Sequence, residues 1–223
     1  MSNKINLKLE RYNFFVFDCD GVLIDSNKLK SLSFEKTLEA YPKNLIEDFL
    51  EYNSLHGGVS RYIKFEYFFS KMLGMREYKN ELNSALKRFS MISNRMINER
   101  AELIPGIIDF LSKLSSKDKK TYVCSGSDQQ DLRKILANKG IDKFFNGIYG
   151  SPRTKSEILV NILTNKDNKD RGVFFGDAFS DYEAATSFKM DFIFVSFNSD
   201  WINGKKISQS HSFKTISSFM DIK

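Results

Sequence analysis

Cysteine is scarce in this sequence: only Cys19 and Cys124 occur among 223 residues. They provide neither a disulfide framework nor the paired spacing of a structural zinc site. Each cysteine stands beside a cluster of polar residues, at a point where an apolar stretch ends. We therefore expect a protein of a reducing compartment, with the cytoplasm as its location.

Long apolar runs are also missing. No stretch approaches the roughly 20 apolar residues that a membrane-spanning helix needs. Residues 1–17 contain neither the apolar core nor the small-residue cleavage site of a signal peptide. Apolar residues make up 41% of the chain and charged residues 28%, which is the balance of a soluble globular protein. The sequence therefore predicts no membrane partner.

A dense basic run is the third absence. The net charge is +6, from 34 basic and 28 acidic residues, but the lysines are scattered and no aromatic RNA-binding signature occurs. A solvated, lysine-rich surface explains this charge better than a nucleic-acid partner does. A mildly positive field would still attract phosphorylated metabolites.

Short apolar runs alternate with helical patterns over much of the chain, and the runs are typical of buried parallel strands. The expected strands are Tyr12–Phe17, Thr121–Cys124, Gly147–Tyr149, Gly172–Phe175 and Phe192–Val195. The expected helices are Ile107–Leu114, Asp128–Asn138, Ser156–Leu163 and Ser180–Phe188. This alternation predicts an α/β fold with a doubly wound, mainly parallel sheet.

Residues 26–104 break the alternation, because they contain helical patterns and no convincing strand. Phe65, Phe68 and Phe69 recur at helical spacing and predict a buried helix face rather than a cofactor site. Pro105 and Gly106 mark the return to the alternating pattern. We therefore expect two domains, an α/β core of residues 1–25 and 105–223 and an inserted all-helical domain of residues 26–104.

Polar clusters follow the expected strands at their carboxyl ends, where an open α/β sheet forms its ligand crevice. Asp18 and Asp20 stand one residue apart after the first apolar run, where their like charges repel and resist burial. This pair makes sense if a positive group lies between the two carboxylates. The other clusters contain Ser125, Gly126, Lys155, Asp177 and Asp181.

These residue types suit phosphoryl transfer. Carboxylates from separate loops can hold Mg²⁺, which keeps waters and accepts phosphate oxygens. Ser125 and backbone N–H groups at a helix start can bind a phosphate, and Lys155 adds a positive charge. One aspartate can then attack phosphorus while its neighbour moves the proton. Simpler roles stay open: Ser125 as a helix cap, Asp181 as a helix N-terminal charge, and Arg153 in place of Lys155.

The segment FDCDGVLIDS, followed by CSGS, Lys155 and GDAFSD in that order, resembles the haloacid dehalogenase-like superfamily with an inserted helical cap. The resemblance covers nearly the whole chain. It implies that Asp18 is the nucleophile and Asp20 the general acid and base. It also implies that Asp18, the backbone carbonyl of Asp20 and Asp177 hold Mg²⁺. Ser125, Gly126 and Lys155 would bind the phosphoryl group, Asp181 would orient Lys155 or a metal-bound water, and Asp25 looks like a hinge residue.

The stretch from Ser54 to Arg61, SLHGGVSR, resembles the cap loop of β-phosphoglucomutase-like proteins. By that resemblance Arg61 contacts the substrate, and His56 is a second candidate for substrate specificity. The simpler alternative is a helix start with Ser60 as the cap and Arg61 in solvent. Two departures weaken the mutase hypothesis: Gly57 stands where these mutases have a lysine, and Lys30 where they have a hinge histidine.

The sequence thus favours an Mg²⁺-dependent phosphatase for a small phosphorylated metabolite, such as a sugar phosphate. The alternatives are a phosphosugar mutase and a non-catalytic phosphate-binding protein of the same fold. Phosphonate hydrolysis would need a cap lysine that forms a Schiff base, and the sequence singles out none. The oligomeric state is left open.

Overall fold

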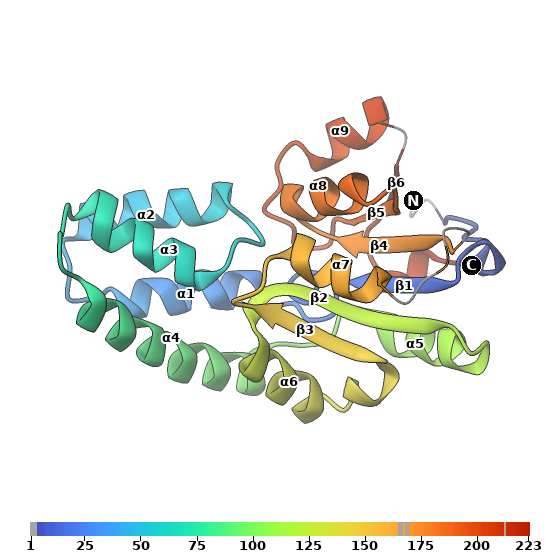
Figure 1. Ribbon diagram of the computed structural model, residues 1–223, viewed down its shortest axis with the longest axis horizontal. Helices are drawn as coiled ribbons and strands as arrows, with labels where there is room; N and C mark the ends of the chain where they lie inside the picture. Colours follow the sequence, from blue (N-terminus) through green and yellow to red (C-terminus); the bar gives the residue numbers. More distant parts are fainter. Residues whose placement is uncertain (1–3, 165–166, 168–169, 212) are drawn as a thin grey trace.

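A computed structural model describes residues 4–164, 167, 170–211 and 213–223 of the chain. Its centre is a parallel sheet with the strand order β3-β2-β1-β4-β5-β6 (Figure 1). The strands are β1 (Phe14–Phe17), β2 (Lys120–Asp128), β3 (Gly147–Ser151), β4 (Gly172–Gly176), β5 (Asp191–Val195) and β6 (Lys214–Ile216). The prediction of a parallel α/β sheet is therefore confirmed.

The strand predictions differ from the structure in detail. The first strand begins at Phe14 rather than Tyr12, because Tyr12 ends a short 3₁₀ turn, η1 (Leu9–Arg11). Strand β2 continues past Cys124 to Asp128, with an irregular register between these residues. Strand β6 and the helix before it, α9 (Gly204–His211), were not predicted.

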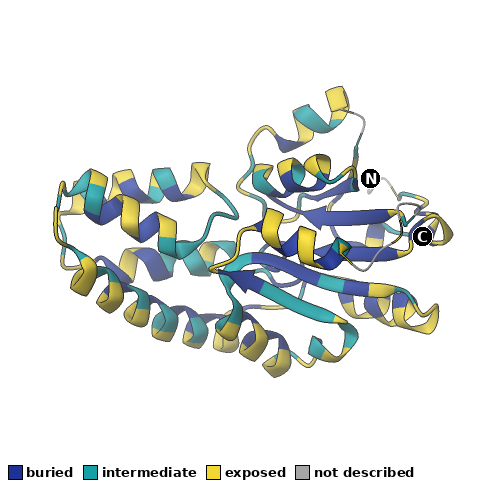
Figure 2. Ribbon diagram, viewed as in Figure 1, coloured by how far each residue is buried: buried dark blue, intermediate teal, exposed yellow. Residues whose placement is uncertain are grey.

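Helices cover both faces of the sheet, and each face has its own apolar cluster. Alternate residues of β1 point in opposite directions, so Phe15 and Phe17 belong to one cluster and Phe14 and Val16 to the other. Helices α5 (Ile107–Ser116) and α6 (Gln129–Asn138) contribute to the first cluster, and α7 (Lys155–Leu163) and α8 (Phe179–Ser187) to the second. Figure 2 shows the central strands as buried ribbons between these layers. The remaining short turns are η3 (Asp142–Phe144) and η4 (Phe219–Asp221).

The segment between β1 and α5 forms a helical unit, which we call the cap, at one end of the sheet (Figure 1). Its elements are α1 (Asn27–Thr37), α2 (Lys43–Leu55), α3 (Arg61–Tyr67), a π-helical turn η2 (Phe68–Met72) and α4 (Lys79–Arg100). The predicted phenylalanine stripe is buried there, with Phe65, Phe68 and Phe69 in an apolar cluster separate from those of the sheet. The boundaries of the two domains stay a prediction, since Ile97, Ala101 and Ile104 of the predicted insertion pack in a cluster of the sheet.

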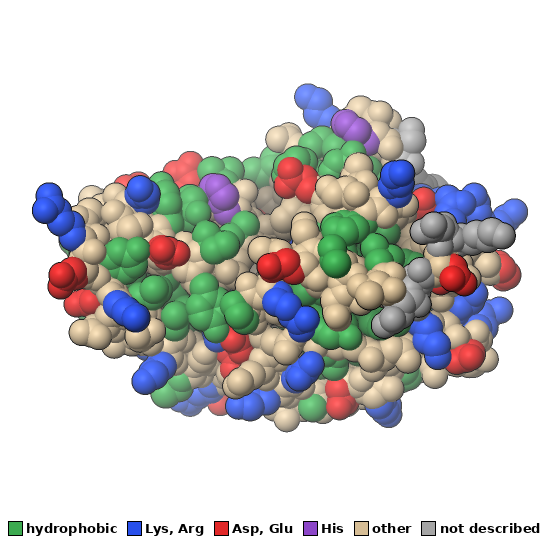
Figure 3. Space-filling view, viewed as in Figure 1, with side chains coloured by type: hydrophobic (Ala, Val, Ile, Leu, Met, Phe, Trp, Pro, Cys, Tyr) green, Lys and Arg blue, Asp and Glu red, His purple; other side chains and the backbone are tan. Residues whose placement is uncertain are grey.

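The surface shows no concentration of basic side chains on the face drawn in Figure 3, where lysines and arginines are dispersed among acidic groups. None of the helices in the described part of the chain is both long and apolar enough to cross a membrane.

Candidate active site

Asp18 directly follows β1 and lies at the centre of the site. The residue is buried, and its Oδ1 atom is 3.6 Å from Nζ of Lys155. Burial raises the pKa of Asp18 to about 7, against the opposite effect of Lys155. Oδ1 has no hydrogen-bond partner among the described residues. A buried carboxylate oxygen is therefore left available for a ligand.

Two further carboxylates approach Asp18. One oxygen from each of Asp18, Asp177 and Asp181 lies within 4.8 Å of the others. Asp177 follows β4, the neighbour of β1, which is why the two side chains meet at the sheet edge. Burial and the charge of Asp18 raise the pKa of Asp177, although Asn27 donates a hydrogen bond to it at 2.7 Å. Three buried carboxylates in this arrangement fit a hard divalent cation, which would offset their repulsion.

Lys155 is the first residue of α7 and is buried with its ammonium paired to Asp181. Thr154 and Glu157 cap this helix reciprocally and so fix its start. Burial alone would lower the pKa of Lys155, but Asp18 and Asp181 outweigh burial and the pKa lies above its ordinary value. Arg153 is exposed and donates to Gln129 instead. The structure thus places Lys155 beside the nucleophile candidate, and Arg153 away from it.

Asp181 lies in the first turn of α8 and is fully buried. Besides the ammonium of Lys155, its carboxylate accepts the backbone N–H of Ala178 at 3.1 Å. The side chain is therefore more than a solvated charge at a helix start. It is placed to hold Lys155 toward Asp18.

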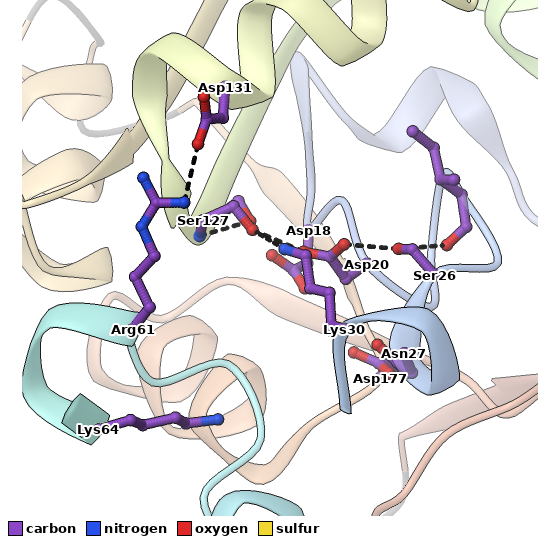
Figure 4. Close-up of polar contacts among 12 residues, drawn as sticks. Asp18, Asp20, Ser26, Asn27, Lys30, Arg61, Lys64, Ser127, Asp131 and Asp177 are labelled. Carbon is purple, nitrogen blue, oxygen red and sulfur yellow. Dashed lines mark hydrogen bonds and ion pairs between the residues drawn. The ribbon is translucent and has the colours of Figure 1, made fainter. Parts of the chain in front are cut away.

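The carboxylate of Asp20 is not a member of this acidic cluster and contacts Lys30, Ser127 and Ser26 instead (Figure 4). Its Oδ2 atom is 2.5 Å from Nζ of Lys30 and 2.6 Å from the hydroxyl of Ser127, and its Oδ1 accepts from Ser26 at 2.5 Å. Burial alone would raise the pKa of Asp20, but Lys30 and the two hydroxyls lower it below its ordinary value. Any contribution of Asp20 to a metal would come from its backbone carbonyl, as the resemblance implies, and not from this carboxylate.

Sequence reasoning missed the partners of Asp20. Lys30 was noted only as a departure from the mutase pattern, and Ser26 and Ser127 were given no role. A signal existed for Ser127, since it lies in the polar cluster that follows the predicted strand Thr121–Cys124. The contact of Lys30 depends on how α1 leaves the sheet, which no local pattern encodes.

Ser125 and Gly126 lie in the last part of β2, rather than beyond it as predicted. Ser125 is buried, and its hydroxyl accepts the N–H of Ser127 at 3.2 Å. Helix α6 starts later, at Gln129, and the side chain of Asp128 caps it. The alternative of Ser125 as a helix cap is therefore wrong. Its burial close to the other clusters leaves phosphate binding as its predicted role.

The cap touches the core through glycines. A Cβ atom on Gly126 would lie 2.1 Å from the carbonyl oxygen of Gly58. Gly58 itself has a φ of +75°, and a Cβ there would lie 2.8 Å from Nζ of Lys155. The hydroxyl of Ser180 also donates to the Gly57 carbonyl at 3.0 Å. Glycines at 57, 58 and 126 thus let the cap loop lie directly over the site.

Arg61, the first residue of α3, is not solvated. Its Nη1 atom donates to Asp131 at 2.8 Å, and its Nη2 atom is 3.6 Å from Asp128 (Figure 4). Only 10% of its side chain is exposed. The guanidinium lines the cavity but is committed to two carboxylates of the core. Its predicted contact with substrate therefore stays a prediction.

His56 is exposed at the end of α2. Its ring lies 4.0 Å from the ring of Tyr52, and its Nδ1 atom is 2.8 Å from the Tyr52 carbonyl oxygen. It lines the mouth of the cavity without contacting the acidic cluster. A role for His56 in substrate specificity also stays a prediction.

A cavity of about 470 Å³ lies between cap and core. Its core wall contains Asp18, Asp20 and Asp177, and its cap wall contains Lys30, Arg61 and Lys64. This volume suits a small molecule. The lining therefore combines acidic side chains of the core with basic side chains of the cap.

Comparisons with known proteins agree with this fold. A family model described as haloacid dehalogenase-like hydrolase matches residues 15–195. A curated phosphorylated carbohydrates phosphatase of Thermotoga maritima is 26% identical over 178 residues, 77% of this chain and 79% of that protein. A solved structure described as a predicted phosphoglycolate phosphatase of Haemophilus somnus has a TM-score of 0.71 at 18% identity, covering 95% of this chain and 96% of that chain. CbbY of Rhodobacter sphaeroides, solved with phosphate, has a TM-score of 0.67 at 12% identity, covering 93% and 95%.

Proposed function

Because this chain belongs to the haloacid dehalogenase-like hydrolases, we propose that it is an Mg²⁺-dependent phosphatase of a small phosphorylated metabolite. The observation that carries the proposal is the unbonded Oδ1 atom of Asp18, buried 3.6 Å from the ammonium of Lys155. A carboxylate oxygen in this position can attack a phosphoryl group that Lys155 neutralises. The curated relative acts on phosphorylated carbohydrates by its description, which favours a sugar phosphate here.

Asp18 would form a bond to phosphorus as the bond between phosphorus and the leaving oxygen breaks. Asp20 would give its proton to that oxygen and then take a proton from the water that hydrolyses the aspartyl phosphate. The contacts of Asp20 with Lys30 and Ser127 favour its ionised form, which suits the second step. The first step needs the protonated form, so we expect Asp20 to exchange Lys30 for the leaving oxygen when substrate binds.

The remaining residues would bind the transferring phosphoryl group. Lys155 faces Asp18 from the start of α7, and Asp181 holds its ammonium in that direction. Ser125 is buried in the last part of β2, the strand that pairs with β1, and can donate its hydroxyl. The cap loop at Gly57 and Gly58 excludes water from above.

The acidic cluster fits Mg²⁺, and we propose Asp18, Asp177 and the backbone carbonyl of Asp20 as its ligands from the protein. When bound, Mg²⁺ would neutralise phosphoryl oxygens and lower the repulsion that Asp18 meets on attack. Asp177 would be held for this role by Asn27, which donates to one of its oxygens at 2.7 Å.

The partner that this site implies is a small phosphate ester. Both cysteines are free and buried, which agrees with the proposed reducing location in the cytoplasm. Neither a nucleic acid nor a membrane is proposed as a partner.

The test is a screen for phosphate release over sugar phosphates, phosphoglycolate and nucleotides with Mg²⁺ present. We expect saturable release from at least one ester, with no isomer of the sugar phosphate formed. Isomer formation without net phosphate release would show a mutase. Tight phosphate binding without turnover of any ester would show a non-catalytic binding protein. Either result would overturn the proposed function.

A further inference from the structure

Lys64 is a buried lysine of the cap that lines the cavity. It lies on α3, one turn after Arg61, and only 5% of the residue is exposed. Figure 4 shows the two side chains leaving the helix in different directions, Arg61 toward Asp131 and Lys64 away from that contact. A lysine is almost never buried to this extent unless its charge is paired.

The contacts of the Lys64 ammonium are with neutral groups. Nζ donates to the side-chain oxygen of Asn53 at 2.7 Å and lies 3.4 Å from the Asn53 carbonyl oxygen. It also lies 5.7 Å from the centre of the Phe34 ring. In the described part of the chain, no carboxylate lies within 4.0 Å of it. The ammonium therefore has no charged partner among the described residues.

The other basic side chains of the cavity wall are neutralised. Lys30 forms an ion pair with Asp20, and Arg61 forms one with Asp131. Among the described lysines and arginines that line the cavity, Lys64 alone lacks such a pair. A buried cation without a counter-ion destabilises the fold. Its position on the cavity wall is explained if the counter-ion is part of the ligand.

The surroundings support this explanation. Burial and the ammonium of Lys30 lower the pKa of Lys64 to about 7, and the carboxylates of Asp20 and Asp200 act in the opposite direction without cancelling that effect. The space beside Lys64 therefore favours an added negative charge. An anion there would restore the lysine to its charged form and form a charge-assisted hydrogen bond.

We propose that Lys64 binds a second acidic group of the substrate, a carboxylate or a second phosphate, at the end remote from the transferring phosphoryl group. This inference rests on the proposed phosphatase function and narrows its substrate class to phosphate esters that carry another anionic group. The preference would come from the remote contact, since Lys155 and Asp18 meet only the phosphoryl group that all these esters share.

The test compares esters that differ only in the remote group. Phosphoglycolate is matched with 2-hydroxyethyl phosphate, and 6-phosphogluconate with sorbitol 6-phosphate, so that a carboxylate is exchanged for a hydroxymethyl group. Fructose 1,6-bisphosphate is matched with fructose 6-phosphate to test a second phosphate. We expect kcat/KM in at least one pair to favour the acidic ester by about 10- to 100-fold, the range for a hydrogen bond between charged groups.

The variant Lys64→Met keeps an unbranched apolar side chain about as long as the lysine stem and removes the ammonium. It should bring the members of the preferred pair to within about threefold of each other in kcat/KM. Lys64→Arg should keep part of the preference, because the charge remains while its geometry changes. The matched control is Lys43→Met, which makes the same chemical change at an exposed lysine of the cap and should keep the full ratio.

Binding should follow the same pattern without turnover. In an Asp18→Asn background, calorimetry should give a lower Kd for the acidic ester than for its neutral match, and Lys64→Met should remove that difference. This binding measurement detects the contact of Lys64 with the ester even if a substitution also changes the catalytic rate by altering the fold.

Three results would overturn the proposal. The first is that the wild-type protein releases phosphate but prefers the acidic ester in no pair. The second is that Lys64→Met lowers kcat/KM equally for both members of the preferred pair. The third is an adduct of Lys64 with an aldehyde ester that borohydride traps by reduction, since Lys64 would then act as a neutral nucleophile. Absence of phosphate release from every ester would instead contradict the proposed function.

Discussion

The guanidinium of Arg61 lies 2.8 Å from the carboxylate of Asp131, and this contact joins helix α3 of the cap to helix α6 of the core. Two residues of α4 strengthen the contact, since Ser90 donates to Asp131 at 2.9 Å and Asn94 at 2.7 Å. Three cap side chains therefore converge on one core carboxylate. Their hydrogen bonds keep the pKa of Asp131 below its ordinary value. Asp131 thus holds the cap against the core.

The first prediction is that Arg61 and Asp131 are energetically coupled. In a cycle of Arg61→Ala, Asp131→Ala and the double variant, the losses in kcat/KM should be non-additive by about 0.5–3 kcal/mol, as for contacting residues. The measurement is steady-state kinetics on the preferred ester. Additive losses would show that this contact does not hold the active arrangement of the cap.

The same variants also test the predicted contact of Arg61 with substrate. If Arg61 binds the remote end, Arg61→Ala should harm the preferred ester much more than a small generic phosphate ester. Equal losses on both esters would show that Arg61 acts only through Asp131.

The second prediction concerns Asp18. Asp18→Asn should stop formation of the aspartyl phosphate, because the amide oxygen is a poor nucleophile. The fold should be retained, since the substitution removes a buried charge whose pKa burial already raises to about 7. Mass spectrometry after rapid quenching checks for the phosphorylated protein. Near-normal turnover by this variant would remove Asp18 from the role of nucleophile.

The third prediction separates Asp20 from Asp18. Asp20→Asn should slow the hydrolysis of alkyl phosphates by about 10²–10⁴-fold, the usual contribution of general acid–base catalysis. The loss in the rate of phosphoryl transfer should be smaller for aryl phosphates, whose leaving groups need less protonation. Burst kinetics measure that first step. Equal losses on both ester types would argue against Asp20 as the acid.

The fourth prediction is a requirement for a divalent cation. Chelation should abolish turnover, because Asp18, Asp177 and Asp181 place three carboxylates where phosphate must bind. Mg²⁺ should restore activity, and Ca²⁺ should restore much less because its coordination is larger and looser. Activity that persists in excess chelator would contradict the proposed metal role.

The fifth prediction concerns stability and pH at Lys64. In the unfolded chain Lys64 has an ordinary lysine pKa. In the folded protein burial and the charge of Lys30 lower this pKa to about 7. Lys155 acts in the same direction, and Asp20 and Asp200 oppose it. Below pH 7 the native lysine is charged and its burial penalty is complete. The penalty shrinks as pH rises from 7 toward the ordinary value.

Lys64→Met should therefore raise Tm relative to the wild-type protein, and the increase should be larger at pH 6 than at pH 9. Differential scanning calorimetry of the ligand-free proteins provides the comparison, with Lys43→Met as the control for loss of an exposed charge. A lower Tm at both pH values would show that the bond to Asn53 makes Lys64 a stabilising residue instead.

Much of the site could be predicted because adjacent parallel strands end at the same edge. Strand β1 pairs with both β2 and β4, so residues that directly follow these strands must meet. Asp18 and Asp177 were found in this way, and Lys155 by its place in the order of motifs. Strand β6 escaped because it has three residues, too few for a periodic signal.

Other features depend on tertiary position and leave no local pattern. Lys64 stands in a helix, where lysine is ordinarily solvated, and its burial against Asn53 and Phe34 depends on how the cap helices pack. The direction of the Asp20 carboxylate depends on Lys30, ten residues further along the chain, and on Ser127, which lies in another strand, β2. The contact of Arg61 with Asp131 likewise requires α6 to lie beside α3. The sequence left only two alternatives for Arg61, a contact with substrate or exposure to solvent.

The contact of Gly58 with Gly126 has a consequence for how this enzyme can change. Beside Lys155 the cap meets the core through main chain, and a Cβ on Gly126 would strike the Gly58 carbonyl. Substitutions at Gly58 or Gly126 are therefore restricted by contacts with the main chain. We expect the cap loop beside Lys155 to keep its shape. On the cap wall, by contrast, Lys64 and Asn53 line the cavity. The substrate range could thus drift by substitutions at that wall while the chemical step stays the same.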